Sequence, residues 1–272
     1  SNTISSITRE NIIDLHARAL SPNNLTFAVA GDIDLDALVD LLEDKFGSWK
    51  GNSSNKLKVF TTVALPSQRT IYLIDKPNAQ QSYIVAGQLL PPSATDEEIK
   101  LDYMNYAIGG SFTARLNMNL REDKSWSYGV RTRLAAAKGQ RAMLVTAPVQ
   151  TDKTAESITE IVNEYSAYLG STPVTDAELA KGKASKTLRL PGQFETLGAL
   201  KNGVSGIVTY NRDLDYLNQL PGLLDEPTLE DVQNMAQSYI KPEQWIWLIV
   251  GDLNKIEDPI RNLNLGEVMV ID

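Results

Sequence analysis

A long-range internal repeat constrains this 272-residue chain more than any other feature of its sequence. Four residues recur at one constant offset of 220 positions without a gap, and the pairs are Glu10 and Glu230, Pro22 and Pro242, Gly31 and Gly251, and Asp32 and Asp252. Between these points both copies predict the same order of elements: an amphipathic helix, a turn that begins with proline, and an apolar strand that ends in Gly-Asp. The strands read LTFAVAGD at 25–32 and WIWLIVGD at 245–252. The shared order indicates two copies of one structural module.

The repeat also predicts the domain organisation. A module of about 200 residues lies within the usual size range of a single domain. Residues 69–272 are therefore predicted to form one nearly complete copy. Residues 1–50 are predicted to be the C-terminal tail of a preceding, truncated homologous domain whose body lies upstream. Residues 51–68 begin with the polar, turn-rich stretch GNSSNKLK and are predicted to be a linker between the two.

The hydrophobic periodicity of the complete copy predicts an α+β fold. Strands are expected at 69–75, 81–90 and 244–251, with a β-hairpin over 128–149. Helices are expected over the remaining periodic stretches, at 95–110, 113–122, 151–169, 175–189, 194–209 and 228–240. Capping boxes are predicted where a threonine precedes a glutamate by three positions, at Thr95 with Glu98 and at Thr175 with Glu178. Paired strands and paired helices predict a mixed or antiparallel sheet with helices packed on one face.

The composition excludes several kinds of catalytic site in this chain. It contains no cysteine and a single histidine, His16. A zinc site without cysteine normally needs at least two histidines, or histidine with carboxylates at a set spacing. His16 lies in IIDLHARAL, whose apolar spacing predicts an amphipathic helix and gives the residue no catalytic neighbours. We therefore expect this chain alone to bind no zinc and to hydrolyse no peptide.

Charge and hydropathy argue against nucleic-acid binding and against a membrane-spanning helix. The formal net charge is −8, and no cluster of Lys and Arg residues offsets it, which disfavours binding to nucleic acid. The longest apolar runs, such as 245–250, are far shorter than the roughly 20 residues that a membrane helix needs. No membrane span is therefore predicted.

The segment GGSFTARLNMNLREDKSWSYGVRTRL at 109–134 combines a glycine pair with a short helix, a polar loop and a strand. It resembles the C-terminal, substrate-binding domain of the pitrilysin/insulinase family of zinc metallopeptidases, the inverted zincins, to which the mitochondrial processing peptidases are related. The residues that carry the resemblance are Gly109, Gly110, Ser111, Arg115, Leu116, Leu120, Arg121, Glu122, Tyr128 and Gly129. The segment at 21–49 is similar to the end of the preceding domain in this family, whose duplicated domains agree with the repeat.

The resemblance implies a role for this chain as the substrate-binding half of a zinc metalloendopeptidase that degrades peptides or unfolded segments in a closed chamber. The H-x-x-E-H zinc motif of the catalytic half is absent from this sequence. Zinc in the intact enzyme is thus expected to be bound by an N-terminal domain or subunit outside this chain, and no metal by this chain itself. The resemblance further implies that Arg121 and Tyr128 contact the peptide substrate and stabilise the transition state.

Other expectations follow from the resemblance more loosely. Bacterial relatives of this kind are often periplasmic or associated with the cell envelope, and assembly into a homo-oligomer stays open. A non-catalytic scaffold or partner subunit of the same family is the alternative function. For the two residues themselves the alternative is structural: Arg121 as a solvated helix charge near Glu122 and Asp123, and Tyr128 as a packed residue of a strand. An unrelated α+β interaction domain would require both the repeat and the motif to be coincidental.

Overall fold

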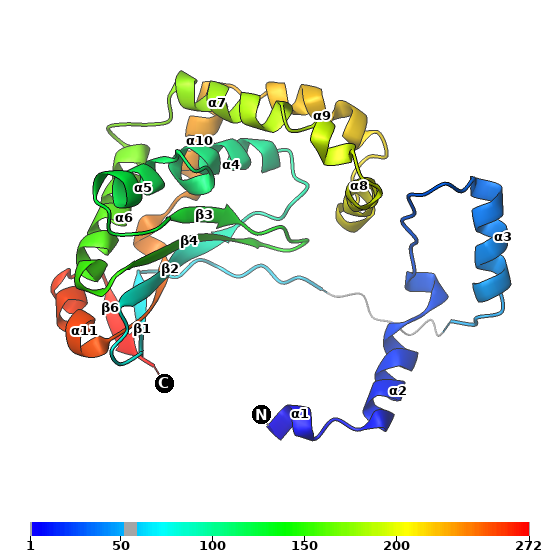
Figure 1. Ribbon diagram of the computed structural model, residues 1–272, viewed down its shortest axis with the longest axis horizontal. Coiled ribbons are helices and arrows are strands. Elements are labelled where there is room, and N and C mark those ends of the chain that lie inside the picture. Colours follow the sequence, from blue (N-terminus) through cyan, green and yellow to red (C-terminus); the bar gives the residue numbers. More distant parts are fainter. Residues whose placement is uncertain (1, 52–58, 272) are drawn as a thin grey trace. The chain divides into compact units, whose positions relative to one another are not determined.

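The computed structural model of the chain describes residues 2–51 and 59–271 (Figure 1). Seven residues of the predicted linker 51–68, those at 52–58, lie outside the described residues. The chain divides into two compact units. One comprises Ser1–Val59 with Pro191–Asp213, and the other comprises Phe60–Leu190 with Leu214–Asp272. We call them unit 1 and unit 2.

Unit 2 is built on a mixed sheet whose six strands, among the described residues, follow the order β3-β4-β2-β5-β1-β6. The strands are β1 (Thr70–Asp75), β2 (Gln81–Leu90), β3 (Arg131–Leu134), β4 (Arg141–Gln150), β5 (Ile246–Gly251) and β6 (Glu267–Val270). β1 pairs in parallel with β5 and β6, and the other neighbours pair antiparallel. The predicted α+β fold with a mixed sheet is thus confirmed. β5, from the C-terminal copy of the repeat, lies in the interior of the sheet between β2 and β1.

Alternating side chains explain why one face of the sheet carries the core. Successive residues of a strand point to opposite faces, and in β5 Trp247 and Ile249 are fully buried while Ile246 is half exposed. The same alternation runs along β4, where Met143 and Val145 are buried and Leu144 is exposed. The buried rows of neighbouring strands lie on the same face. That face therefore forms the floor of a hydrophobic core that the helices complete.

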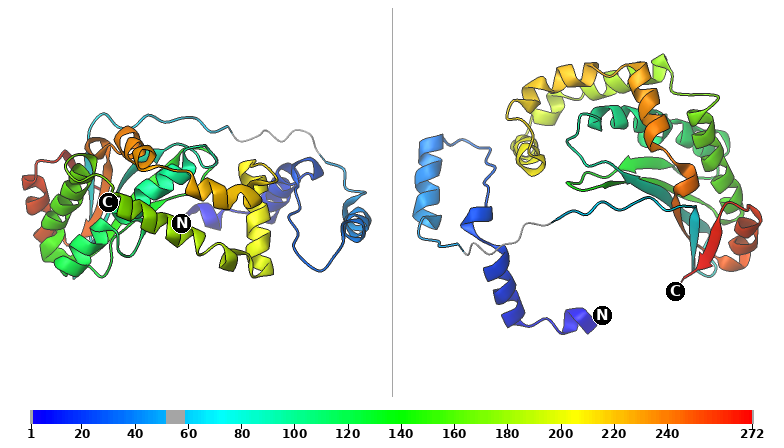
Figure 2. Two further views of the ribbon diagram at one scale, coloured as in Figure 1. Left: turned by 90° about the horizontal axis from the view of Figure 1, so that it is seen from above. Right: turned by 180° about the vertical axis from the view of Figure 1, so that it is seen from behind.

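Helices cover this face of the sheet (Figures 1 and 2). The helices α4 (Glu98–Asn105), α6 (Thr154–Leu169) and α11 (Leu253–Asn262) contact the strands. The helices α5 (Arg115–Asn117), α7 (Asp176–Thr187), α9 (Tyr216–Asp225) and α10 (Leu229–Tyr239) pack on these helices or on one another. Side chains such as Leu101 of α4, Ile161 of α6 and Val232 of α10 are fully buried in this core. None of the described helices is both long enough and apolar enough to cross a membrane.

Helix starts show where local sequence decides the structure. α7 begins with the predicted capping box, in which Thr175 and Glu178 exchange hydrogen bonds with each other's backbone N–H groups. The capping box predicted for Thr95 and Glu98 is wrong. α4 begins at Glu98 itself, and the Glu98 carboxylate accepts a hydrogen bond from the N–H of Ala94 at 3.1 Å. Glu98 is thus at the first helical position and not at the third, where a capping box needs its glutamate.

Unit 1 has less regular structure. Its elements are α1 (Asn2–Ser5), α2 (Arg9–Ala19), a 3₁₀ turn at Pro22–Asn24, α3 (Leu35–Phe46), a 3₁₀ turn at Pro191–Phe194 and α8 (Leu197–Tyr210). The strand predicted at 25–32 is not formed. No strand of the described residues lies beside this segment, and an isolated strand has no partner for its backbone N–H and C=O groups.

Candidate functional site

The motif segment 109–134 starts where a helix passes close to the sheet. A π-helical turn, Tyr106–Gly110, extends α4 and ends at the glycine pair. A Cβ atom on Gly109 would lie 2.3 Å from the Oγ1 atom of Thr132 and 2.9 Å from its backbone nitrogen, which is in β3. Backbone at that distance cannot yield to a side chain, so the close approach of helix and strand requires glycine.

The short helix α5 and the π-helical turn that follows it, Met118–Asp123, are held by buried side chains. Leu116 and Leu120 are fully buried in the core of unit 2. Asn117 is 3% exposed, donates a hydrogen bond to the carbonyl of Phe112 at 2.7 Å and accepts one from the N–H of Val130 at 3.0 Å. Asn117 thereby joins the two ends of the motif. π-helical turns are frequent at functional sites, and here two of them flank α5.

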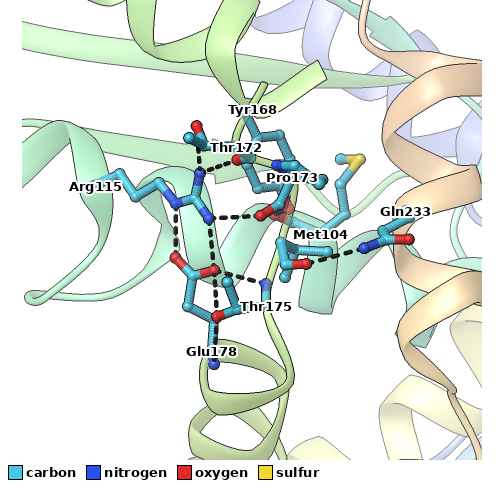
Figure 3. A network of polar contacts seen from close by, with 9 residues as sticks. Met104, Arg115, Tyr168, Thr172, Pro173, Thr175, Glu178 and Gln233 are labelled. Carbon is cyan, nitrogen blue, oxygen red and sulfur yellow. Dashed lines mark hydrogen bonds and ion pairs between the residues drawn. The ribbon is translucent and has the colours of Figure 1, made fainter. Parts of the chain in front are cut away.

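Arg115 is at the centre of a polar network that ties the motif to α7 (Figure 3). Its Nε and Nη2 atoms donate to the two carboxylate oxygens of Glu178, each at 2.6 Å. The same guanidinium group donates to the carbonyls of Thr172 and Pro173 and lies over the ring of Tyr168, 5.1 Å from its centroid. All three nitrogen atoms of the group thus donate hydrogen bonds within the protein. The arrangement assigns Arg115 a structural role.

The pKa values of the pair agree with this role. The hydrogen bond with Glu178 raises the pKa of Arg115 above its ordinary value. Burial by itself raises the pKa of Glu178, but the hydrogen bonds from Arg115 and from the N–H of Thr175 more than offset it, so the net pKa is lowered. Both groups are held in their charged forms.

Arg121 has a different environment from Arg115. It lies in the second π-helical turn, and its guanidinium carbon is 4.6 Å from the centroid of the Phe112 ring. Its Nε atom is 3.4 Å from the carboxylate of Glu122. The side chain of Arg121 is 35% exposed, and Phe112 is itself 59% exposed. Arg121 therefore has an aromatic support on one side and open solvent for its remaining donors.

Tyr128 has an exposed side chain on a fixed piece of backbone. Its side chain is 86% exposed, which leaves it out of the packing of the sheet. The preceding residue, Ser127, forms a β-bridge with Val149, and its hydroxyl donates to the carbonyl of Pro148 at 2.6 Å. The N–H of Gly129 in turn donates to the Ser127 hydroxyl at 3.1 Å. The phenol is thus presented to solvent from a loop whose backbone is anchored on both sides.

Arg121 and Tyr128 come from the two ends of one loop, but the contacts recorded for the described residues do not join them directly. Both present hydrogen-bond donors outward. Guanidinium and phenol groups can donate to carbonyl oxygens of an extended peptide. Sequence reasoning missed Phe112, which supports Arg121, and Asn117, which fixes the loop. Phe112 could have been found as an aromatic residue within the motif, whereas no sequence pattern indicated Asn117.

A cavity lies on the sheet face opposite the helices. It has a volume of about 410 Å³, and its apolar walls include Val85, Leu144 and Leu248 of the sheet and the segment 63–66. The Gln140 side chain holds this segment, because it accepts from the N–H of Val63 at 2.6 Å and donates to its carbonyl at 2.9 Å. Residues 60–68 of the predicted linker 51–68 thus belong to unit 2.

The donor groups of residues 2–51 and 59–271 do not fit a zinc site. His16 lies exposed on α2, in unit 1. In the part of the chain that the structure describes, no three His, Cys, Asp or Glu side chains are grouped so that they could hold a metal ion. A zinc ion of the usual tetrahedral kind needs three or four such ligands.

Comparison with known proteins places this geometry in a family. Residues 6–186 match the model of the peptidase M16 inactive domain. An uncharacterized zinc protease of Mycobacterium leprae is 25% identical over 242 residues, which cover 88% of this chain and 53% of that protein. The chain thus spans about half the length of this relative.

Solved structures share the fold. The crystal structure of a peptidase M16 inactive domain from Pseudomonas fluorescens superposes with a TM-score of 0.83 at 18% identity, over 93% of this chain and 60% of that one. The periplasmic protease PqqL from Escherichia coli superposes with a TM-score of 0.75 at 20% identity, over 92% of this chain and 28% of that one. The resemblance inferred from the motif is confirmed, and the chain belongs to the family of peptidase M16 inactive domains.

Proposed function

We propose that this chain is the substrate-holding half of a zinc-dependent metalloendopeptidase, in which Arg121 and Tyr128 donate hydrogen bonds to the peptide. The observation that carries the proposal is the exposed phenol of Tyr128 on an anchored loop, within a chain of the peptidase M16 inactive-domain family. Because the backbone of the loop is already fixed, binding of a ligand has to order only the side chain of Tyr128.

In this proposal Arg121 and Tyr128 act by electrostatic stabilisation of the transition state. When a peptide bond is attacked, negative charge develops on its carbonyl oxygen, and preorganised donors stabilise that charge. The Tyr128 hydroxyl is a single directed donor, and the guanidinium group of Arg121 offers several in one plane. The ring of Phe112 lies 4.6 Å from the guanidinium carbon and limits the directions in which those donors can point. Neither residue needs to touch a metal ion for this role.

Zinc, in this proposal, is held by an N-terminal domain or a separate subunit that also belongs to the active protein. The names of the relatives as zinc proteases support this view. The substrates are peptides or unfolded segments that fit between the two halves, and the apolar cavity beside segment 63–66 could receive an apolar side chain of the peptide. A periplasmic or envelope location is part of the same proposal, with the periplasmic PqqL as its support.

The repeat is the basis of the proposed domain organisation. Residues 1–50 are proposed to be the tail of a preceding homologous domain, 51–68 a linker, and 69–272 the substrate-holding domain. The boundary between the two compact units at Val59 and Phe60 falls inside the proposed linker and supports it, whereas Pro191–Asp213 of the proposed domain group with unit 1.

The experiment that tests the function replaces single donor groups in the complete, zinc-loaded protein or complex. Tyr128→Phe and Arg121→Ala are each expected to lower kcat for a peptide substrate about 100-fold to 1,000-fold, the usual effect of losing one oxyanion donor. Tyr83→Phe is the matched control, because Tyr83 is also an exposed tyrosine of unit 2 but lies in β2, outside the motif. Turnover within twofold of the parent for Tyr128→Phe would favour the alternative role as a scaffold or partner subunit.

A further inference from the structure

The sheet face opposite the helices is arranged in rows that cross the strands. Residues directly opposite each other on paired strands point to the same face. From β3 across β4 and β2 to β5, the register of one row joins Arg133, Leu144, Gly87 and Ile246. The register of the next row joins Arg131, Thr146, Val85 and Leu248. Each row therefore begins with an arginine at the edge of the sheet and continues over uncharged residues.

Arg131 and Arg133 are exposed cations on the same face of β3. Thr132 between them points to the helices, where its hydroxyl oxygen lies 2.9 Å from that of Tyr165, so the two arginine side chains leave the other face. Residues two apart in a strand are separated by about 7 Å, and like charges at that distance repel each other. Neither guanidinium group forms a hydrogen bond or an ion pair with any residue that the structure describes. The pair thus lacks a balancing negative charge.

The apolar cavity lies in the same rows. Its volume of about 410 Å³ is within the range of about 300–1,000 Å³ that is usual for ligand pockets. Gly87 lines it, and a Cβ atom at this position would overlap the carbonyl oxygen of Met143, so the row has no side chain between Leu144 and Ile246. Leu144 lines the cavity and lies directly opposite Arg133. An unpaired cation therefore borders an apolar hollow.

The charge at this edge of the sheet is opposite in sign to the net charge of −8 of the chain. Among the described strand residues of the open face, the charged ones are Arg131 and Arg133 on β3 and Glu267 on β6. β3 and β6 are the two edge strands of the sheet. Because neighbouring strands lie about 4.8 Å apart, Glu267 is about 24 Å from Arg133, too far to neutralise it. The ligand that complements the β3 edge is an anion.

We propose that Arg131 and Arg133 select peptide substrates by binding the carboxylate of an Asp or Glu residue, while the cavity beside Leu144 takes a bulky apolar side chain two positions away in the same peptide. In an extended peptide, side chains two positions apart share one face at a distance of about 7 Å. From Arg133, Leu144 lies one strand away, at about 5 Å, and Gly87 two strands away, at about 10 Å, so the spacings match.

The inference rests on the proposed function, since it names the class of peptide that the substrate-holding half accepts. β3 begins three residues after Tyr128, so a peptide held by Tyr128 lies beside the strand that carries both arginines. Arg131 and Arg133 act on binding and specificity, whereas Arg121 and Tyr128 act on the transition state.

Inhibition constants of matched peptides provide the first test. Each pair contains a phenylalanine and, two positions away, either Glu or Gln, and each pair is made in both orders along the peptide. The peptides compete with one fluorogenic reporter in the complete, zinc-loaded protein or complex. We expect the Glu peptide of at least one order to bind about 5- to 25-fold more tightly than its Gln partner, because one exposed ion pair contributes up to about fivefold and two are available. Equal inhibition constants in both orders would overturn the proposal.

Substitutions assign the preference to the two arginines. Arg131→Gln and Arg133→Gln should each lower the ratio of the two inhibition constants by up to about fivefold, and the double variant should bring it to about one. Arg189→Gln is the matched control, because Arg189 is an exposed arginine of unit 2 that lies just after α7, outside the sheet. A ratio that persists in the double variant, or that falls equally in Arg189→Gln, would refute the assignment.

Charge reversal provides a gain that a misfolded variant cannot mimic. Arg133→Glu should bind a peptide with Lys in place of Glu more tightly than the parent does, by up to about fivefold, and the gain should shrink between about 0.05 M and 0.5 M salt. No gain for the Lys peptide in a variant with the circular dichroism spectrum of the parent would contradict the proposal.

The two proposals fail in different measurements. If Tyr128→Phe lowers kcat but the parent does not distinguish Glu from Gln peptides, only the selectivity by Arg131 and Arg133 is refuted. If Tyr128→Phe leaves kcat unchanged while the Arg131 and Arg133 double variant loses the preference, the selectivity is supported and the role of Tyr128 is refuted.

Discussion

Arg115 and Arg121 lie in the same motif, but their surroundings suit them to different roles. The donors of Arg115 bind Glu178 and two backbone carbonyls, and its flat face rests on Tyr168. Arg121, six positions later, has one ring behind it and one carboxylate at 3.4 Å. A guanidinium group with all its donors engaged holds a structure together, whereas one with free donors can bind a ligand.

Stability measurements should separate the two arginines. Arg115→Ala leaves the carboxylate of Glu178 half-buried without its partner, so we expect the free energy of unfolding of the chain to fall by about 2 kcal/mol. Arg121→Ala removes a partly exposed side chain and should change that free energy by less than about 0.5 kcal/mol. Urea titrations of both variants followed by circular dichroism provide the comparison. Equal destabilisation by the two variants would contradict the assignment.

The ring of Phe112 should matter for activity only through Arg121. A cation–π contact at an exposed site contributes about 0.5–1 kcal/mol, so Phe112→Ala in the complete enzyme should lower kcat/KM about two- to fivefold. The same substitution should have no further effect when Arg121 is already alanine, and Phe112→Trp should retain activity. Additive losses in the double variant would show that Phe112 acts by itself, for instance by contacting the peptide.

The sequence could locate the candidate residues but not their environments. The motif spacing singled out Arg121 and Tyr128, and whether they contact substrate is still a prediction. The task of Arg115 could not be read from the sequence because its partner Glu178 lies 63 positions away. Long-range pairs of this kind depend on how α5 and α7 pack, and local patterns carry no information on that packing.

At the scale of elements, the start of α10 provides a test by pH. The Asp231 carboxylate accepts from Lys100 at 2.8 Å and from the N–H and hydroxyl of Thr228, and these hydrogen bonds, that of Lys100 first, lower the pKa of Asp231 to about 2. The pKa is lower in the folded than in the unfolded chain, where it is about 3.9. The stabilising contribution of Asp231 is therefore complete above about pH 4 and is lost as the pH falls through about 2.

Asp231→Asn should remove this dependence. We expect a lower thermal midpoint than the parent at pH 7 and a difference that shrinks steadily between about pH 4 and pH 2. Asp258→Asn is the control, because Asp258 is an exposed carboxylate on α11 whose loss tests the effect of net charge alone. A difference between Asp231→Asn and the parent that stays constant over this range would show that the cap does not depend on the charge.

Elements with a strong period could be predicted, and elements that depend on their neighbours could not. β1, β2, β4, β5 and α10 all lie where the periodicity placed them. α9 and α11 each contain a proline, Pro221 and Pro259, which hides a helix from a pattern search. The opposite error occurred at 25–32, where a strong strand pattern forms no strand because none of the described strands lies beside it. The apolar residues of this segment are of the kind found in strands, but the pattern does not show whether a neighbouring strand is present to pair with them.

For the whole molecule, the number of metal ligands limits the chemistry that the chain can perform alone. Its one histidine is exposed on α2, and it has no cysteine. We expect the purified chain to retain no stoichiometric zinc after dialysis and to cleave no peptide above the blank. The complete gene product or its complex is expected to retain zinc and to cleave the peptide. Elemental analysis and a fluorogenic peptide assay on matched samples measure the two properties. One equivalent of zinc that survives dialysis and disappears in His16→Ala would contradict the assignment of the metal to the other half. Peptide cleavage by the dialysed chain would contradict the division of labour between the halves.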